Sequence, residues 1–320
     1  MTFSLTRRGF ALGGLGLALS GASARAADLS DVTLRVGDQV GTYRSKLQAA
    51  GLLDNLPYKI EWSVYPAAVQ VHESLKAGAI DIGGSNDSPY ISALAGGSKA
   101  VAVSAWTNGG LGTYLLVPKN STVKSVADLR GKTICPTTRG SVAHYLVVGA
   151  LKQAGIPLDS VKLAFLNPVD AGAAFAAGSI DAWATWNVYA ARTRGQLGAR
   201  VIHDGIGINS GLYVNAALPE AIADPGKRAA IADFSNRLEL GFQWSRSNRA
   251  GHNAWYKAFS RQDDETVAAL YDAEANYRRL KLDDVFTARL RETYTTWIEA
   301  GLLQPGLDLA PHVYRDLPVA

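Results

Sequence analysis

Cysteine is almost absent from this sequence, because Cys135 is the only one among 320 residues. A single cysteine excludes an internal disulfide and any zinc site built from several thiolates. The five histidines do not have the spacing of metal ligands, and the sequence contains no phosphate-binding loop and no dinucleotide fingerprint. We therefore expect neither a metal nor a cofactor.

An excess of one charge and a long apolar run are also missing from most of the chain. Three of the 32 basic residues and none of the 28 acidic ones lie in residues 1–26, which leaves 29 against 28 beyond them. This balance excludes a basic patch for nucleic acid or for a membrane surface. Beyond that first segment, no run reaches the roughly 18 apolar residues of a membrane span. With 48% hydrophobic and 19% charged residues, the composition is that of a folded globular protein.

The first 26 residues resemble an export signal. A double arginine, Arg7-Arg8, precedes a mild apolar run rich in glycine and alanine, and Ala24-Arg25-Ala26 fits a small-residue cleavage site. The arginine pair followed by Phe10 is typical of the twin-arginine route, and the general secretory route is the alternative. No cysteine lies near the cleavage point. We therefore predict a soluble, exported, periplasmic protein without a lipid anchor.

Short strands alternate with helices up to about residue 216, and the chain is helical from Pro225 onward. This alternation indicates an α/β protein whose sheets are mixed but mostly parallel and are flanked by helices. The expected strands are Val32–Val36, Tyr58–Val64, Ile80–Gly83, Val101–Trp106, Lys132–Cys135, Val161–Phe165, Ile180–Trp186 and Arg200–Asp204. The expected helices between them include Tyr43–Ala50 with Thr42 as its cap, Pro66–Ala77, Pro89–Ala95, a helix that opens at Ser141, and Tyr189–Gly195.

Two lobes are indicated by an internal echo, because residues 77–81 (AGAID) recur as residues 177–181 (AGSID) at the same place in two strand–helix runs. Extended runs at 112–118 and 212–216 would carry the chain from one lobe to the other and back. We predict that residues 28–111 and 216–320 form lobe 1 and that residues 112–215 form lobe 2.

The clearest candidate for a binding site is the turn from Thr137 into the helix that begins near Ser141. The N–H groups of Gly140, Ser141 and Val142 should be free at this helix start, where the positive end of the helix dipole also favours an anion. Arg139 adds a full positive charge. Ser141 and His144 are three residues apart on one helix face, so they could form a nucleophile pair. The favoured interpretation is a helix cap, with a histidine that faces either solvent or a pocket.

Ligands of open parallel sheets bind beyond the carboxyl ends of the strands. Four loops meet this condition, and if the lobes face each other they line one cleft: Gly37–Thr42, Gly83–Ser88, Thr137–Ser141 and Trp183–Asn187. They offer many neutral N–H and O–H donors, which suit an anion that is always ionised, such as a sulfonate, sulfate or nitrate. Trp183 and Trp186 lie three residues apart on one strand, so at least one of them could close over an apolar tail.

Five segments of the chain are similar to one protein family: Leu75–Gly83, Asp87–Pro89, Val126–Lys132, Gly140–His144 and Asp181–Trp186. The sequence resembles the periplasmic substrate-binding proteins of ABC importers for aliphatic sulfonates, taurine and nitrate. The resemblance implies the two-lobed type II periplasmic-binding-protein fold with two hinge crossovers. It also implies a non-enzymatic, monomeric protein that captures a small organosulfonate and delivers it to a membrane permease with a cytoplasmic ATPase, for sulfur acquisition.

The resemblance implies an anion held between Ser85–Asp87 and Gly140–Val142, with Gln39 and Trp186 nearby. The alternatives are a binding protein for taurine, nitrate or another small anion, and an enzyme on the same fold. Family members often carry an acid where this chain has Asn187, and Gly where it has Asn86; the missing acid favours simple alkyl or ring-bearing sulfonates. The predicted ligand-binding residues are Gln39, Ser85, Asn86, Asp87, Gly112, Arg139, Gly140, Ser141, Val142, His144, Trp183, Trp186 and Asn187.

Overall fold

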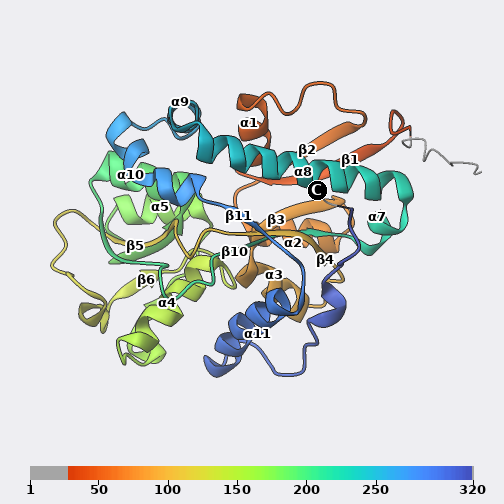
Figure 1. Cartoon of the computed structure of the whole chain (residues 1–320). Helices are drawn as coiled ribbons and strands as arrows, with labels where there is room; N and C mark the ends of the chain where they lie inside the picture. The colour runs from red at the N-terminus through yellow and green to blue at the C-terminus, as the bar shows by residue number, and fades with distance from the viewer. Residues whose placement is uncertain (1–27, 319–320) are drawn as a thin grey trace, which may run out of the picture.

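The computed structural model describes residues 28–318, so the predicted export signal at residues 1–26 lies outside the described residues. Two sheets flanked by helices lie side by side (Figure 1), with strand orders β11-β4-β10-β3-β1-β2 and β7-β6-β8-β5-β9. The strands are β1 (Thr33–Gln39), β2 (Lys59–Tyr65), β3 (Ile82–Asn86), β4 (Val101–Thr107), β5 (Thr113–Val117), β6 (Thr133–Cys135), β7 (Lys162–Leu163), β8 (Ala182–Trp186), β9 (Arg200–Asp204), β10 (Leu212–Ala217) and β11 (Arg278–Leu280). The α-helices are α1 (Thr42–Ala49), α2 (Ala68–Lys76), α3 (Asp87–Ala95), α4 (Val142–Gln153), α5 (Pro168–Ala176), α6 (Asn187–Leu197), α7 (Pro219–Ala223), α8 (Pro225–Ser247), α9 (Arg249–Ser260), α10 (Asp264–Ala275) and α11 (Asp284–Glu299).

Both sheets are mixed, and most of their strands share one direction. In the first sheet β1 is parallel to β2 and β3, whereas β10 is antiparallel to β3 and β4, and β11 is antiparallel to β4. In the second sheet β6 is parallel to β7 and β8, and β5 is antiparallel to β8 and β9. The predicted α/β architecture of two mixed sheets flanked by helices is confirmed. None of the helices in residues 28–318 is long and apolar enough to cross a membrane.

The chain passes twice between the sheets, at residues 108–112 and 205–211, and these two crossings lie against each other. The backbone N–H of Asn108 donates to the carbonyl of Gly211 over 3.1 Å. Gly211 has a φ of 71°, and a Cβ there would lie 2.2 Å from the backbone nitrogen of Gly110. Only glycine fits so close a backbone contact at positive φ. The two crossings are therefore tightly paired where the chain passes between the sheets.

The repeated pentapeptide has the same structural role in both lobes. Asp81 donates its backbone N–H to the carbonyl of Arg35 on β1, and its carboxylate accepts the N–H of the same residue. Asp181 makes the equivalent pair of bonds with Thr133 on β6. Each aspartate thus fixes the start of the strand that follows it, β3 or β8, against the neighbouring parallel strand, β1 or β6. This shared role explains why the same sequence occurs at the same place in both lobes.

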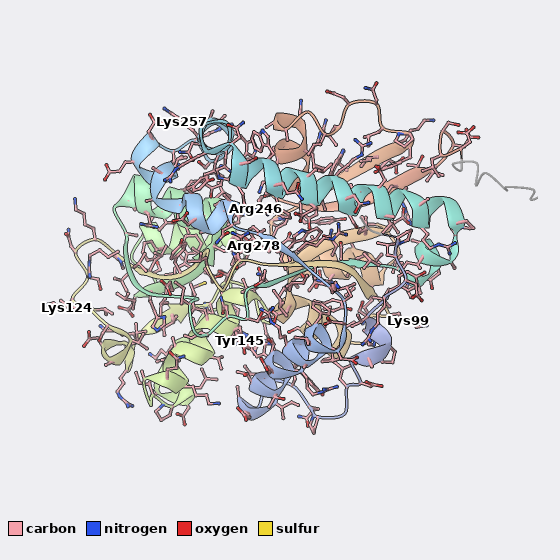
Figure 2. All side chains as sticks on the ribbon, in the orientation of Figure 1. Lys99, Lys124, Tyr145, Arg246, Lys257 and Arg278 are labelled. Atoms are coloured by element: carbon pink, nitrogen blue, oxygen red, sulfur yellow. The ribbon has the colours of Figure 1, made fainter. Side chains whose placement is uncertain are left out.

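Contacts also join the lobes away from the crossings. Tyr145 on α4, labelled near the middle of Figure 2, packs edge-on against Trp297 on α11 at a centroid distance of 5.3 Å. The hydroxyl of Tyr189 on α6 donates to the carbonyl of Pro66 over 3.0 Å. The lobes therefore touch on more than one side of the space between their sheets.

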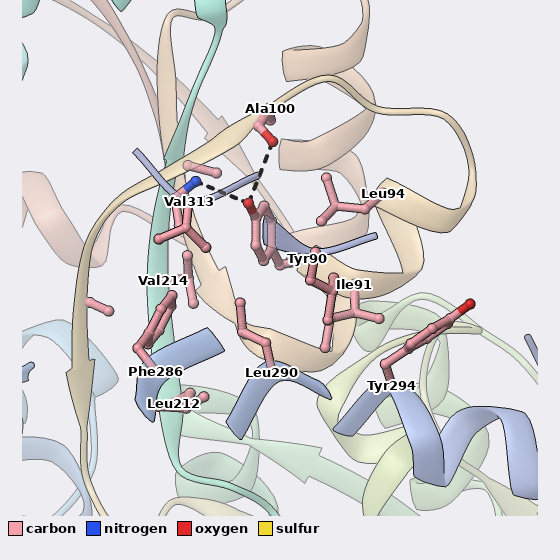
Figure 3. Close-up of a cluster of buried hydrophobic side chains, with 14 of the residues drawn as sticks. Tyr90, Ile91, Leu94, Ala100, Leu212, Val214, Phe286, Leu290, Tyr294 and Val313 are labelled. Atoms are coloured by element: carbon pink, nitrogen blue, oxygen red, sulfur yellow. Dashed lines mark hydrogen bonds between the residues drawn. The ribbon is translucent and has the colours of Figure 1, made fainter. Parts of the chain in front are cut away.

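The core of the first lobe is built around a buried tyrosine on α3 (Figure 3). The hydroxyl of Tyr90 accepts the N–H of Ala102 on β4 over 2.9 Å and lies 3.4 Å from the carbonyl oxygen of Ala100. It also donates to the carbonyl of His312 over 2.6 Å. Phe286 and Leu290 from α11 pack into the same cluster. These contacts fasten the C-terminal segment to the sheet that carries β3, and so fix the position of α3.

Helices α9 and α10 contact the second lobe as well as the first. Trp255, Tyr256 and Leu270 share a buried cluster with Ala191 of α6. Figure 1 shows both helices above the second sheet, at the far end of α8. The lobe boundary at residue 216 stays a prediction, because this part of the chain packs on both sides.

Two local predictions were wrong. Thr42 does not cap α1: the carboxylate of Asp38, at the end of β1, accepts the N–H groups of Tyr43 and Arg44, and the Thr42 hydroxyl donates to a backbone carbonyl. Two of the four predicted loops are not loops. Residues 182–186 form β8, which leads directly into α6. In the stretch 83–88, residues 82–86 pair with β10 and α3 follows directly. Its glycines look like loop residues but are required by close packing, since a Cβ at Gly84 would lie 1.8 Å from the Tyr43 hydroxyl.

Candidate functional site

A cavity of about 60 Å³ lies where the ends of β1, β3 and β8 and the start of β5 come together from the two sheets. This space is large enough for a small polar head group or a few water molecules. Its lining is Gln39, Thr42, Tyr43, Lys46, Asn86, Leu111, Gly112, Thr113, Trp186, Asn187, Tyr213, Leu238, Phe242, Glu274 and Tyr277.

Five of the predicted ligand-binding residues line this cavity: Gln39, Asn86, Gly112, Trp186 and Asn187. Four of them stand at strand ends or at the first residue of a helix, as expected for ligands of open sheets. Gly112 precedes β5 and has a φ of 88°. Residues of both sheets thus line one cavity.

Trp183 and Trp186 point to opposite faces of β8, as their odd spacing requires. The indole N–H of Trp183 donates to the hydroxyl of Thr137 over 3.1 Å, and the ring is core, with 1% of its surface exposed. Trp186 is 7% exposed, and its N–H has no acceptor among the described residues. An indole nitrogen only donates. Trp186 therefore lines the cavity and carries a buried donor that has no acceptor among the described residues.

Ser85 and Asp87 lie behind the cavity rather than on it. The Ser85 hydroxyl is 2.6 Å from Nε2 of the buried His72. The Asp87 carboxylate accepts from the hydroxyls of Ser210 and Thr293, each over 2.6 Å. Burial raises the pKa of Asp87, and these hydrogen bonds oppose the rise. Its role in this structure is to join α3 to α11 and to the second crossing.

The start of α4 is less open than the sequence suggested. The N–H of Gly140 donates to Nδ1 of His144 over 3.2 Å, and the N–H of Ser141 donates to the carbonyl of Thr138. The expectation that these two groups are free was wrong, because the turn bonds them internally. Val142 is buried in the hydrophobic core. None of these residues lines the cavity.

Ser141 and His144 form a helix cap. The Ser141 hydroxyl accepts the backbone N–H of His144 over 3.2 Å, and the imidazole faces away between Phe165 and Trp297. Burial, with a smaller effect of Arg139, lowers the pKa of His144 to about 4, so the ring is neutral at pH 7. Arg139 itself lies over the Phe165 ring at 4.1 Å. The nucleophile-pair alternative is therefore not favoured.

The cavity contains a buried lysine that the sequence analysis did not select. Lys46 on α1 is 5% exposed, and its ammonium lies 4.6 Å from the ring centroid of Phe242 and 5.0 Å from that of Trp255. Burial lowers its pKa, while the charge of Glu274 opposes this. Nearby Arg246, labelled in Figure 2, is paired with Glu239 over 3.1 Å. Lys46 is thus the one basic residue of the lining.

Aromatic rings form much of the remaining wall. Tyr277 stacks on Phe242 at a centroid distance of 4.8 Å, and Tyr213 meets Tyr277 edge-on at 5.7 Å. Tyr43 follows, edge-on to Tyr213 at 6.2 Å. Such a wall binds apolar or cationic groups through its ring faces. The combination of buried donors with an aromatic wall suits an anion that carries a short organic tail.

Backbone strain gathers around the same junctions. Val40, Thr137 and Asn187 have φ values between 51° and 57°, each at a passage from strand to helix. This conformation is uncommon for residues other than glycine, and most costly for β-branched ones. Strain of this kind clusters at binding sites, where it is held by the surrounding structure.

Comparison with known proteins gives the fold and family. Residues 47–225 match the family of the ABC transporter, phosphonate, periplasmic substrate-binding protein. An aliphatic sulfonates-binding protein of Escherichia coli (strain K12) is 38% identical over 200 residues, which span 61% of this chain and 62% of that protein.

Two solved structures share the fold. The alkanesulfonate-binding protein SsuA from Xanthomonas axonopodis pv. citri, bound to MOPS, matches with a TM-score of 0.78 and 27% identity, over 91% of this chain and 100% of that chain. The desulfurization enzyme DSZB matches with a TM-score of 0.57 and 17% identity, over 89% and 97%, which shows likeness of fold alone. The family match covers more than half of the sequence. The chain belongs to the periplasmic substrate-binding proteins of ABC transporters.

Proposed function

We propose that this protein is the solute-binding component of an ABC importer and that it captures a small organosulfonate in the cavity between its lobes. The observation that carries the proposal is that one cavity is lined by both Lys46 and Trp186, and that the buried indole N–H of Trp186 has no acceptor among the described residues. The names of the Escherichia coli and Xanthomonas proteins, both sulfonate binders, support the same ligand class.

The charge of the lining favours a sulfonate over a phosphonate. A sulfonate is a monoanion at all relevant pH values, whereas a phosphonate approaches two charges near neutral pH, like other phosphoryl groups. The lining holds one ammonium, Lys46, and one acidic residue, Glu274, so it can match the single charge of a sulfonate but offers no second cation to a phosphonate. The neutral amide and indole groups can donate without proton exchange. An organic tail can pack against the aromatic wall, whereas nitrate and sulfate have no such group.

Capture would follow from the two paired crossings. Ligand contacts from both sheets stabilise the arrangement in which the lobes touch, so binding shifts the population toward that closed form. The closed form would then dock on a membrane permease that works with a cytoplasmic ATPase. We propose that the protein acts as an exported, periplasmic monomer without a lipid anchor, and that residues 1–26 direct export.

An enzyme on the same fold is the second candidate, raised by the likeness to the desulfurization enzyme. Cys135 does not favour it. This thiol is buried within β6, and burial raises its pKa, which is opposite to the shift that activates a cysteine nucleophile.

A ligand screen tests the proposed function. The chain without residues 1–26 is heated with alkanesulfonates, taurine, methylphosphonate, sulfate, nitrate and a carboxylate control. A ligand at 100 times its Kd stabilises the protein by about 2.7 kcal/mol, which raises the Tm by a few degrees for a chain of this size. We expect stabilisation by organosulfonates alone. Stabilisation by methylphosphonate alone or by nitrate alone would show that the protein binds that anion instead of a sulfonate. No response to any of the anions would contradict the proposal.

A further inference from the structure

Two opposite charges lie in the lining of the candidate cavity. Lys46 on α1 and Glu274 on α10 both line it, and they are 5% and 7% exposed. The Lys46 ammonium lies 3.4 Å from the backbone carbonyl oxygen of Glu274, and the Glu274 carboxylate accepts a hydrogen bond from the Tyr256 hydroxyl. Each charge offsets the other, so the lining by itself is close to electrically neutral.

An organosulfonate disturbs this balance, because it stays a monoanion at all relevant pH values and cannot itself take up a proton. If Lys46 and Glu274 both stayed ionised, the occupied cavity would hold one positive charge and two negative ones. A net charge taken out of water is costly unless it is paired or neutralised. A single proton on the Glu274 carboxylate restores neutrality and keeps the cation that the ligand anion needs.

Hydrogen bonding favours the same change. An ionised carboxylate only accepts hydrogen bonds, and so do the oxygens of a sulfonate, so the two groups cannot bond to each other. A protonated carboxyl carries an O–H that can donate to an anion. Burial raises the pKa of Glu274, while the charge of Lys46 opposes the rise. A ligand anion that faces Lys46 weakens this opposing effect and so raises the pKa of Glu274 further.

The other titratable groups around the pair keep one charge state between pH 7 and pH 8.5. Burial lowers the pKa of His252 to about 3 and raises that of Asp38 to about 6, so in this range His252 is neutral and Asp38 is largely ionised. Arginine side chains stay charged. Arg246 is paired with Glu239, and Arg194 lies over the Tyr114 ring. Burial raises the pKa of every tyrosine near the pair, namely Tyr43, Tyr114, Tyr213, Tyr256 and Tyr277.

We propose that the protein binds an organosulfonate together with one proton, which the Glu274 carboxylate takes up from solvent. This inference rests on the proposed function and adds a proton to its ligand. Lys46 and Glu274 hold one proton between them in the free protein and two in the complex, where the sulfonate balances the Lys46 ammonium. Binding therefore weakens as the pH rises, by up to about 10-fold for each pH unit. The dependence ends at low pH, where the free protein already holds both protons.

The test measures both the pH dependence of binding and the proton itself. The Kd of propanesulfonate and of butanesulfonate is measured by titration calorimetry in Tris between pH 7 and pH 8.5, and again in imidazole at pH 7.5. Neither buffer is a sulfonate, unlike the MOPS bound to the Xanthomonas protein. Because the two buffers differ in ionisation enthalpy, the difference in apparent binding enthalpy gives the number of protons taken up.

The Kd should rise by about 10- to 30-fold from pH 7 to pH 8.5, with uptake of more than about half a proton per ligand at pH 7.5. A constant Kd without proton uptake would overturn the inference and leave the proposed function in place. Failure of both sulfonates to bind at any of these pH values would instead contradict the proposed function.

Variants assign the proton to Glu274. Lys46→Arg keeps a permanent cation, so Glu274 is left as the titrating member of the pair, and proton uptake should persist. Adding Glu274→Gln to this variant should abolish the uptake and make the Kd independent of pH. Adding Glu292→Gln instead, which removes the same charge from an exposed position on α11, should leave the uptake unchanged.

Loss of proton uptake in Lys46→Arg, or its persistence after Glu274→Gln is added, would refute the assignment to Glu274. The proton count of the wild type tests the coupling by itself, so the inference stays open to refutation even if a variant does not fold.

Discussion

Replacing Trp186 by phenylalanine removes the donor on which the proposed site depends. The indole N–H of Trp186 has no acceptor among residues 28–318, so the substitution breaks no hydrogen bond in this part of the chain. In the complex the same N–H would donate to an ionised sulfonate oxygen. Hydrogen bonds to charged groups contribute about 1.5–3 kcal/mol. The Kd of an organosulfonate should therefore rise by about 10- to 150-fold.

Trp183→Phe is the matched control, because this residue lies on the same strand and faces the core. Its N–H is already bonded to Thr137, and its ring packs against Phe175 at 6.0 Å. This variant should lose about 1–3 kcal/mol of unfolding free energy and keep its affinity. Both quantities are measured on both variants, by titration calorimetry and by urea unfolding. If Trp186→Phe kept the wild-type Kd, or if only Trp183→Phe weakened binding, the reasoning would be refuted.

The remaining predictions concern stability and are measured by chemical unfolding. Asp81→Asn should lower the free energy of unfolding by about 2–3 kcal/mol, because the Asp81 side chain is 1% exposed and pairs with Arg35 and Lys227. Asp181→Asn should lower it by less than about 1 kcal/mol, because Asp181 and its partner Lys132 are both largely solvated. Equal losses in the two variants would contradict this. Burial, and to a smaller extent the charge of Lys46, lowers the pKa of His252 to about 3 in the folded protein, so the protein loses stability as the pH drops below the unfolded pKa of about 6.5. His252→Phe should remove about 2 kcal/mol of this loss between pH 6.5 and pH 5. If the variant lost as much stability over this range as the wild type, His252 would not be the cause. Gly211→Ala should cost at least about 2 kcal/mol, more than Gly207→Ala, because only the first Cβ would meet backbone; the reverse order would show that the crossings are not tightly paired.

Local patterns were sufficient to predict the two sheets and five of the fifteen residues that line the cavity. Gln39, Asn86 and Trp186 are the last residues of strands that were predicted from the alternation of strands and helices. Because ligands of open parallel sheets bind beyond the carboxyl ends of the strands, these residues were expected to lie near one another. The group around Ser141 was predicted by the same rule, but its N–H donors are bonded by Thr138 and His144 within one turn. A pattern of residue types cannot show that such bonds are made internally.

Lys46 and Glu274 were missed for a different reason. Lys46 lies on a short helix beside Leu47, where a lysine is usually solvated. It is enclosed by Phe242 and Trp255, which are about 200 positions away in the sequence but in contact with it in the fold. Glu274 comes from a helix near the C-terminus that packs over the second lobe. Both charges are buried by tertiary contacts alone. The sequence offered one indication of these buried charges, namely a charged residue on the apolar side of a helix. This pattern is the same whether the charged end of the side chain reaches solvent or is buried.

The most direct test of the account is a crystal structure of the protein with a short alkanesulfonate. We predict a sulfonate oxygen about 3 Å from the Trp186 indole nitrogen, with the same head group near the Lys46 ammonium. A sulfonate bound instead at the start of α4, beside Arg139 and Ser141, would contradict the assignment of the site.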